Sequence, residues 1–571
     1  MSKKQKQLIT SILAVAIVVV VAVIAIVIKI TPSKEVKDLN EYYQVNDDEM
    51  LIFMEDQQYE EKGLYVDNQV YLDYNTVITE INKRFYWDSY EKVLSLTTPT
   101  EIIKVSIGKK TYNVNKSKEK VEYEIVRQKD DKIYIALDFV KKYSNVEYQK
   151  FLDPNRVMIN CHWGQEYQYA QADKAVSVRT EPDIKSPILA DVNPGGLFIY
   201  ANCEGESASN GFVKVITEDG VIGYVRSKYL MDSYYLKLEN DYKEPEYTSI
   251  KSDKTINMAW HQVFGNSGAN QLESLISKAK GLNVISPTWF TLKNNDGEIN
   301  SLADEQYVKK AHDKGIQVWA LINDIDNETK IDRAKLLGKT SSRERLINNL
   351  IAEAISKNID GINLDFENIS ADSAKAYLAF VRELSVKCRN NGIVLSIDNY
   401  TPEAYNTFYD IEEQGIVADY VVIMAYDEHY QGSEESGSVS SISFVKNALT
   451  NTISDVPAEK VIMALPFYTR LWKETKSGDG VKVSSEAYNM VNAAKLMQDK
   501  GVTLEWNEEI GQYYGQYKED NATYKMWLED EKSYELKLQT VFSEKIAGVS
   551  AWKLGLELDS VWNSISKYTS K

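Results

Sequence analysis

The longest apolar stretch of the chain lies near its N-terminus, where residues 8–28 contain no charged side chain. Three lysines among the first six residues precede this stretch, and Lys29 follows it. These 21 residues, at a helical rise of about 1.5 Å each, span roughly 30 Å, the thickness of the hydrocarbon core of a bilayer. A cleavable signal peptide usually has an apolar region of only about 7–15 residues and a small-residue cleavage site, and no convincing site follows Ile28.

The pattern therefore predicts an uncleaved signal anchor over residues 1–30. Because lysine-rich flanks stay on the cytoplasmic side, we expect a cytoplasmic N-terminus and a single membrane-spanning helix. All residues after Lys29 would then lie outside the cell membrane, at the bacterial cell surface.

Short strand and helix patterns alternate over residues 40–162 and form a weak repeat. Residues 70–74 and 133–137 each read as a strand that is followed by a helical pattern and a further strand. We therefore expect an α+β module in this part of the chain. His162 beside Cys161 suggests a ligand pair, but without a second pair we favour a structural role and predict no metal site.

Residues 170–232 read as all-β. Strand patterns such as Val176–Arg179, Phe212–Val215 and Ile222–Val225 alternate with turns that contain proline or glycine. The segment is predicted to be a small β-barrel, and the charged, tyrosine-rich residues 241–254 after it are predicted to be a linker.

Eight apolar strand patterns alternate with helical stretches in the C-terminal part of the chain. They lie at residues 256–260, 284–286, 317–321, 361–367, 394–397, 420–425, 461–465 and 548–552. This layout predicts the α/β class and a (β/α)8 TIM barrel over residues 250–571, a fold of usually about 250 residues plus insertions. The one long connection, residues 467–546 between the seventh and eighth strands, is rich in Trp and Tyr and predicts a small insertion domain.

The fourth of these strands carries polar residues where a parallel sheet has no solvated face. Asn363, Asp365 and Glu367 alternate with apolar residues and point to one side. Buried carboxylates are costly unless they take part in chemistry. Residues two apart on a strand lie about 6.5–7 Å apart, so charge on Asp365 would raise the pKa of Glu367. Asp360 has the opposite parity, and we expect it to be structural.

Barrel chemistry takes place at the C-terminal ends of the strands, which directs attention to other residues there. Tyr426 and Asp427 end the sixth strand, and Trp552 ends the eighth. Trp319, near the end of the third strand, and Trp289, just after the second, are candidate walls of a substrate cleft, with packing as the alternative for both.

The amino-acid composition limits the classes of molecule that the protein can bind. The net charge of −18 disfavours nucleic acid, because phosphate binding needs clustered basic side chains. The 38 Tyr and 10 Trp serve packing or sugar stacking, since a flat ring suits the apolar face of a pyranose. Three cysteines in an exported chain argue against a disulfide framework. A bridge between Cys161 and Cys203 stays open as an alternative to free thiols, which we favour.

Three separated motifs resemble the signature of glycoside hydrolase family 18. They are Asp360-x-x-Asn363-x-Asp365-x-Glu367, Met424-x-Tyr426-Asp427 and the final-strand Trp552. The resemblance covers residues 255–568, and "DGINLDFEN" and "GVSAWKLG" are most similar to the branch of spore-cortex and cell-wall-lytic N-acetylglucosaminidases.

The two preceding segments also resemble known modules. Residues 40–162 resemble the N-terminal domain of copper amine oxidases, and no metal follows from that resemblance. Residues 170–232, with "VRTEPDIKSPIL" and "GYVRSKYL", resemble the bacterial Src-homology-3-like domain, often a cell-wall-binding module.

The family resemblance implies a retaining mechanism in which the acetamido group of the substrate is the nucleophile and no cofactor is needed. It implies that Glu367 protonates the glycosidic oxygen and later activates water. Asp365 would hold the acetamido N–H, and Tyr426 would donate to the acetamido oxygen. Asp427 would help to orient the sugar, and Trp552 would form the floor beneath it.

One position departs from the family pattern. Most members have Asp where this chain has Asn363, and there the two Asp side chains can share a proton. We expect Asn363 to donate a hydrogen bond that keeps Asp365 ionised, and Asn363→Asp to shift the pH–rate profile without abolishing turnover.

The resemblance implies cleavage of β-1,4 bonds beside N-acetylglucosamine, in peptidoglycan or in chitin-like polysaccharide. The alternative is a non-hydrolysing carbohydrate-binding protein of the same fold. Such proteins typically lack the acid, whereas Glu367 is present here. The predicted membrane anchor and the Src-homology-like module favour a wall substrate.

Overall fold

The computed structural model describes residues 2–201, 209–265, 268–325, 330–477 and 480–570. The chain forms two compact units. The first comprises residues 1–85, 105–112 and 119–244, and the second comprises residues 86–104, 113–118 and 245–571. Cys203 lies outside the described residues, so the predicted alternative of a Cys161–Cys203 bridge stays a prediction. Among the described residues, Cys161 and Cys388 form no disulfide.

The first unit begins with the apolar helix α1 (Lys3–Ile30), as predicted. The Ser2 hydroxyl caps its N-terminus by accepting a hydrogen bond from the Gln5 N–H, and the Gln5 side-chain oxygen accepts from the Ser2 N–H. Within the described part of the chain, α1 is the one helix whose length and composition suit a membrane crossing.

The α+β part of the first unit is built on a mixed sheet with the strand order β10-β11-β4-β3-β1-β13-β12. Both predicted strand–helix pairs are present: β4 (Gln69–Asp73) leads into a short helical turn, and β11 (Lys132–Ala136) leads into α4 (Leu137–Lys142). The other strands are β1 (Glu49–Met54), β3 (Gly63–Val66), β10 (Val126–Lys129), β12 (Glu147–Phe151) and β13 (Arg156–Asn160).

Cys161 and His162 directly follow β13 and meet Glu55, which directly follows the neighbouring parallel strand β1. Both backbone N–H groups donate to Glu55 Oε1, at 2.6 and 2.8 Å, and His162 Nδ1 lies 2.8 Å from Glu55 Oε2. These contacts supply the hydrogen bonds that the buried Glu55 carboxylate requires. His162, for which we predicted a structural role, therefore has a hydrogen-bonding partner in Glu55, 107 residues away in sequence.

The all-β part of the first unit is an antiparallel sheet with the order β16-β15-β19-β18-β17-β14-β20. Its strands are β14 (Glu166–Gln171), β15 (Val176–Arg179), β16 (Ile188–Val192), β17 (Leu197–Tyr200), β18 (Phe212–Thr217), β19 (Ile222–Arg226) and β20 (Tyr234–Lys237). Inward residues such as Val178, Phe198, Val215 and Val225 are fully buried and form its core.

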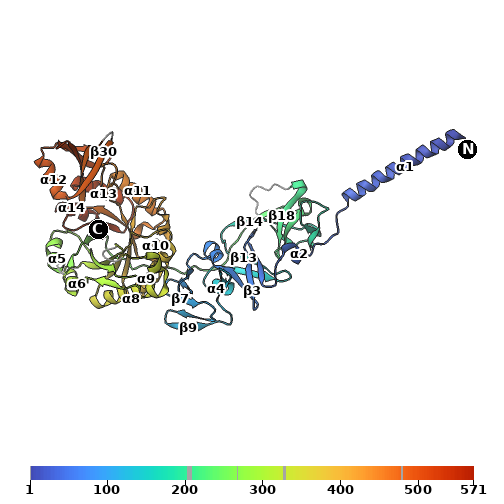
Figure 1. Cartoon of the computed structure of the whole chain (residues 1–571), viewed down its shortest axis with the longest axis horizontal. Coiled ribbons are helices and arrows are strands. Elements are labelled where there is room, and N and C mark those ends of the chain that lie inside the picture. Colours follow the sequence, from blue (N-terminus) through green and yellow to red (C-terminus); the bar gives the residue numbers. More distant parts are fainter. Residues whose placement is uncertain (1, 202–208, 266–267, 326–329, 478–479, 571) are drawn as a thin grey trace. The chain divides into compact units, whose positions relative to one another are not determined.

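The second unit contains the predicted barrel, drawn in green to red in Figure 1. Its eight parallel strands close because β21 pairs with both β22 and β34. The strands are β21 (Ile256–His261), β22 (Val284–Leu292), β24 (Gln317–Asn323), β25 (Gly361–Asp365), β26 (Val394–Tyr400), β27 (Tyr420–Met424), β28 (Val461–Pro466) and β34 (Gly548–Trp552).

Helices surround this barrel, as Figure 1 shows. They are α5 (Gly268–Ile276), α6 (Glu305–His312), α7 (Arg333–Gly338), α8 (Thr340–Lys357), α9 (Ala374–Asn390), α10 (Ile411–Val417), α11 (Ile442–Ile453), α13 (Glu531–Val541) and α14 (Val561–Thr569). The contact between the outer face of the strands and these helices holds most of the buried apolar residues of the unit. Each strand is therefore covered on both sides, which is why its sequence is nearly all apolar.

The insertion between β28 and β34 is an antiparallel sheet with the order β30-β29-β33-β32-β31. Its elements are β29 (Tyr468–Ser477), β30 (Gly480–Asn489), α12 (Met490–Asp499), β31 (Glu505–Asn507), β32 (Gln512–Glu519) and β33 (Ala522–Leu528). The last helix of the predicted insertion range, α13, packs against the barrel helices α11 and α14.

Residues 86–104, within the predicted α+β module, pack with the barrel unit. They include β5 (Tyr86–Asp88) and β6 (Val93–Thr97) of a small sheet that continues through β7 (Ile102–Ser106), β8 (Thr111–Val114) and β9 (Ser117–Lys120). Asp88 is fully buried and accepts hydrogen bonds from the N–H and the hydroxyl of Thr340, both at 2.7 Å.

This contact caps α8, the helix that leads into β25. Lys339, at the N-cap of α8, provides no side-chain bond, whereas Asp88 and Glu91 accept from the N–H groups of Thr340 and Ser341. Two carboxylates from the small sheet thus satisfy orphan donors at the positive end of the helix dipole.

A buried ion pair lies beside the cap. Arg343 of α8 and Glu383 of α9 meet at 3.0 Å, and the ring of Tyr86 covers the Arg343 guanidinium at 4.8 Å. Burial would raise the pKa of Glu383, but Arg343 and Lys104 together hold it below its usual value.

We expect Asp88→Ala to lower the free energy of unfolding of the barrel by about 1–3 kcal/mol, because it leaves buried donors of α8 unsatisfied. Chemical denaturation followed by tryptophan fluorescence measures the change. Glu119→Ala, at an exposed acid of the same sheet, is the matched control. Equal stability of the two variants would contradict the proposed capping role.

Candidate active site

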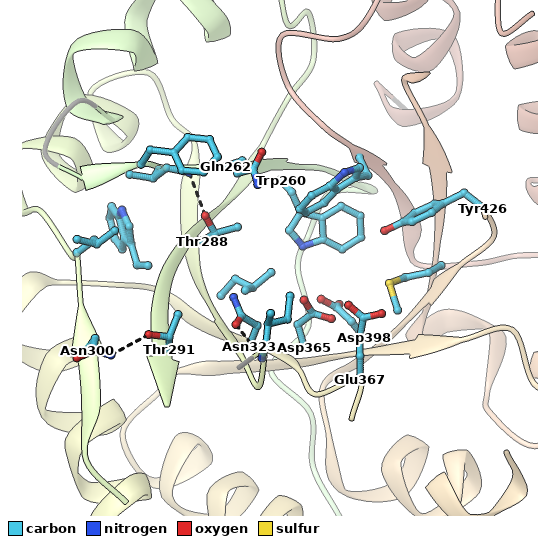
Figure 2. Close-up of a pocket in the computed structure, with 18 of the residues that line it drawn as sticks. Trp260, Gln262, Thr288, Thr291, Asn300, Asn323, Asp365, Glu367, Asp398 and Tyr426 are labelled. Atoms are coloured by element: carbon cyan, nitrogen blue, oxygen red, sulfur yellow. Dashed lines mark hydrogen bonds between the residues drawn. The ribbon is translucent and has the colours of Figure 1, made fainter. Parts of the chain in front are cut away.

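A cavity of about 700 Å³ opens at the C-terminal ends of the barrel strands (Figure 2). The structure brings together six of the residues predicted for the site. Asp365, Glu367, Tyr426, Asp427, Trp552 and Trp289 all line this cavity. Figure 2 shows the Tyr426 hydroxyl pointing toward the carboxyl groups of the cavity floor.

Asn363 lies beneath the cavity, fully buried. Its side-chain oxygen accepts from Trp260 Nε1–H at 2.8 Å and from the Ser286 hydroxyl at 3.0 Å. Its amide nitrogen donates to Ser396 Oγ at 3.0 Å and to Asp398 Oδ1 at 2.7 Å. All of its hydrogen-bonding capacity is therefore used within the barrel.

The expected hydrogen bond from Asn363 to Asp365 is not formed. The two residues lie two apart on one strand, whereas Asn363 pairs in register with Ser396 on β26. Neighbouring strands are about 4.8 Å apart, closer than residues two apart on the same strand. The amide of Asn363 therefore reaches the adjacent strand and donates to Asp398 instead.

Asp365 and Glu367 sit in different surroundings. Burial raises the pKa of Asp365 well above its usual value, and the charges of Asp398 and Glu367 add to the rise. Burial also raises the pKa of Glu367, a hydrogen bond from Tyr400 opposes the rise, and the charge of Asp324 adds to it. The predicted elevation for Glu367 is present, but burial is its main cause.

Tyr426 and Asp427, after β27, and Trp552, the last residue of β34, line the cavity with the carboxylates. The Tyr468 hydroxyl, from the start of β29, donates to Asp427 Oδ1 at 2.6 Å and fixes that side chain. The Trp552 ring lies 5.8 Å from the Trp260 ring at an angle of 57°, and both rings line the cavity. The insertion thus contributes to the site through the first residue of β29.

The two tryptophans predicted as candidate walls have different positions. Trp289 lines the cavity and packs edge-on against Tyr307. Trp319 is the third residue of β24 rather than one near its end, and it stacks on Tyr420 inside the barrel, fully buried. Gly361 leaves room for it, since a Cβ there would lie 2.6 Å from the Trp319 ring. Trp319 therefore has the packing role, not that of a wall.

Asp360 has the structural position that its parity predicts. His312 Nε2 lies 2.7 Å from Asp360 Oδ2, and the same oxygen accepts from the Val318 N–H at 2.7 Å. These contacts connect the start of β25 to the start of β24, away from the cavity.

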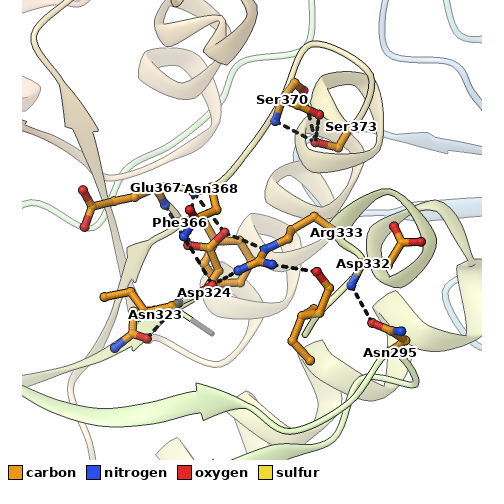
Figure 3. Close-up of polar contacts among 12 residues, drawn as sticks. Asn295, Asn323, Asp324, Asp332, Arg333, Phe366, Glu367, Asn368, Ser370 and Ser373 are labelled. Carbon is orange, nitrogen blue, oxygen red and sulfur yellow. Dashed lines mark hydrogen bonds and ion pairs between the residues drawn. The ribbon is translucent and has the colours of Figure 1, made fainter. Parts of the chain in front are cut away.

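Asp324, just after β24, holds the backbone at the C-terminal end of β25 (Figure 3). Its buried carboxylate accepts from the Glu367 N–H at 2.9 Å and from the Asn368 N–H at 3.1 Å. Arg333 Nε donates to the same carboxylate at 3.2 Å. Figure 3 shows the Glu367 side chain pointing away from this cluster, so Asp324 fixes the direction in which Glu367 leaves the strand.

Comparison with protein-family models matches residues 234–557, more than half of the chain, to the glycosyl hydrolases family 18. The chain belongs to glycosyl hydrolase family 18. Two further models match: the copper amine oxidase N-terminal domain over residues 53–157 and the bacterial SH3 domain over residues 174–231. All three resemblances predicted from the sequence are confirmed, and the protein is a glycoside hydrolase.

Similar proteins fit this assignment. The uncharacterized glycosylase YvbX of Bacillus subtilis (strain 168) is 30% identical over 300 residues, which are 50% of this chain and 85% of that protein. The cortical fragment-lytic enzyme of Bacillus anthracis is 26% identical over 40% of this chain and 54% of its own length. The C-terminal domain of a putative chitinase from Desulfitobacterium hafniense DCB-2, 21% identical, has the same fold, with a TM-score of 0.50 over 55% of this chain and 98% of that domain.

The family 18 site contains acids that sequence reasoning missed. Asp398 lines the cavity from β26, which was predicted to end at Ile397. Ser396, Asp398 and Tyr400 alternate with Ile397 and Asn399, and this alternation is the signal that would have identified an inward polar face. Asp324 had no such signal, because its role depends on a backbone in another strand.

Proposed function

We propose that this glycoside hydrolase cleaves β-1,4 linkages beside N-acetylglucosamine by a retaining, substrate-assisted mechanism. The observation that carries the proposal is the convergence of Asp365, Glu367 and Tyr426 on one cavity at the C-terminal end of the barrel. The family is an exception to the usual scheme of a carboxylate nucleophile paired with a carboxylic acid.

Glu367 is the proton donor in this proposal. Burial raises its pKa, which extends the pH range in which Glu367 is protonated and can act as a general acid. As the glycosidic C–O bond breaks, the Glu367 proton passes to the leaving oxygen, and the acetamido oxygen of the substrate bonds to the anomeric carbon. Water then opens the resulting oxazolinium ring and gives a proton back to Glu367.

Asp365 and Tyr426 handle the acetamido group. Asp365 accepts its N–H and stabilises the positive charge of the ring intermediate, and the Tyr426 hydroxyl donates to its oxygen. Asp427, fixed by Tyr468, orients the sugar, and the half-buried Trp552 ring forms the floor beneath its apolar face. Asn363 lies beneath the cavity and contributes to substrate binding indirectly, by positioning other side chains such as Asp398.

We infer a cell-wall substrate, peptidoglycan before chitin. The matches to the cortical fragment-lytic enzyme and to the bacterial SH3 domain support a wall polysaccharide. The apolar helix α1 supports a single-pass anchor with the N-terminus in the cytoplasm and the catalytic barrel at the cell surface. A carbohydrate-binding protein without hydrolysis is the competing function, and the presence of Glu367 in the cavity favours the enzyme.

We expect Glu367→Gln to lower kcat by about 10²–10⁴-fold, the usual contribution of a general acid, while binding persists. Release of reducing ends from purified peptidoglycan and from chitin oligomers measures turnover by the full chain in mild detergent. Glu403→Gln, on the connection after β26, is the control. Retained binding with no product from either polymer in the unmutated protein would establish the non-hydrolysing alternative instead.

We expect Tyr400→Phe to move the alkaline limb of the kcat/KM profile to higher pH, by up to about one unit. The Tyr400 hydroxyl favours the ionised form of Glu367, so its loss raises the pKa of the acid and extends the pH range in which Glu367 is protonated. Tyr405→Phe, at an exposed ring farther along the same connection, is the control. A shift to lower pH would show that Glu367 does not act as the acid.

A further inference from the structure

A second buried carboxyl group lies beside Asp365. Leu364 of β25 pairs in register with Ile397 of β26, so Asp365 and Asp398 follow one residue later on neighbouring parallel strands. Both point into the barrel, and Figure 2 shows their carboxyl groups next to each other at the floor of the cavity. Both side chains are buried.

Each of these carboxyl groups has one oxygen without a partner. Asp398 Oδ1 accepts from the Asn363 amide at 2.7 Å. Asp398 Oδ2 and Asp365 Oδ1 are buried and accept no hydrogen bond from any described residue. Two ionised carboxylates cannot satisfy each other, and a buried acceptor without a donor costs about 1–3 kcal/mol. A single proton between the two groups would satisfy both free oxygens.

The surroundings of the pair favour such a proton. The charged groups that act on it are the carboxylates of Glu367, on the same side of β25, and Asp324, after β24. The titratable hydroxyls that interact with it come from β26, the residues after β27, α9 and the turn after β26; they are Tyr400, Tyr426, Tyr377 and Tyr409. Negative charge and burial both oppose ionisation of the second carboxyl group.

We propose that Asp365 and Asp398 hold one proton between them and that Asp398 is a positioning residue that acts through Asp365. The role assigned to Asp365 rests on the proposed function. In the free enzyme, the hydrogen bond from Asn363 places the negative charge on Asp398 and the proton on Asp365. When an acetamido N–H needs an acceptor, the proton crosses to Asp398, Asp365 becomes ionised, and no proton leaves the site.

This arrangement gives Asn363 a different meaning from the one expected. The carboxyl group that Asn363 lacks is present one strand away, and the Asn363 amide orients it. Asn363→Asp alone would add a third buried carboxyl group against Asp398. The double substitution Asn363→Asp/Asp398→Asn would place both carboxyl groups, at positions 363 and 365, on β25. The amide at position 398 of β26 could then hydrogen-bond to them.

Infrared difference spectroscopy tests the shared proton without turnover. The full chain carries Glu367→Gln in every sample, which removes the acid and its own protonated carboxyl band. At neutral pH, Asp365→Asn and Asp398→Asn should each abolish the same protonated carboxyl band, and the double variant should lose no more than either single variant. A band that survives Asp398→Asn, or two bands lost in the double variant, would overturn the proposal.

Kinetics with Glu367 intact test the positioning role. Asp398→Asn should lower kcat at least about tenfold, with less effect on KM, and alter the pH–rate profile. The exchange variant Asn363→Asp/Asp398→Asn should recover most of the lost kcat and also remain folded if Asp398→Asn does not. If the exchange variant is no more active than Asp398→Asn, then Asp398 does not take the place of the carboxyl group that Asn363 lacks. The infrared measurement needs no substrate. It therefore tests the shared proton even if the protein proves not to hydrolyse glycans.

Discussion

The hydrogen bonds of the Asn363 side chain are the constraint on which the site depends. They join β25 to β21, β22 and β26 through Trp260, Ser286 and the Ser396–Asp398 pair. A parallel barrel has no solvated strand face, so polar groups in its interior must satisfy one another. Because the amide of Asn363 is committed to β26, Asp365 is left with a free oxygen at the floor of the cavity.

A second group of contacts fixes the same strand from outside the barrel interior. Asp324 accepts from the backbone at Glu367, and Asp88 caps the helix that leads into β25. In both cases a buried carboxylate is balanced by N–H donors or a cation. The strand that carries Asp365 and Glu367 is thus held at its beginning and at its end, which keeps the two side chains aimed into one cavity.

The alternation of apolar and polar residues predicted the strands, the barrel and the inward direction of Asp365 and Glu367. These features depend on the two-residue period of a strand, which is visible in the sequence. The alternation failed where a partner is distant in sequence. The contact between Asp398 and the Asn363 amide on the neighbouring strand has no local signal, and Trp319 was placed near the end of its strand, whereas it is the third residue of β24. Residues 86–104, within the predicted α+β module, also pack with the barrel unit, a contact for which the local sequence carries no signal.

The anomeric configuration of the first product tests the central claim most directly. Nuclear magnetic resonance, recorded during cleavage of a β-linked N-acetylglucosamine oligomer or glycan strand by the full chain, identifies the anomer before mutarotation. Attack by the acetamido group followed by water inverts the anomeric carbon twice, so the account predicts that the β-anomer appears first. Initial release of the α-anomer would contradict it.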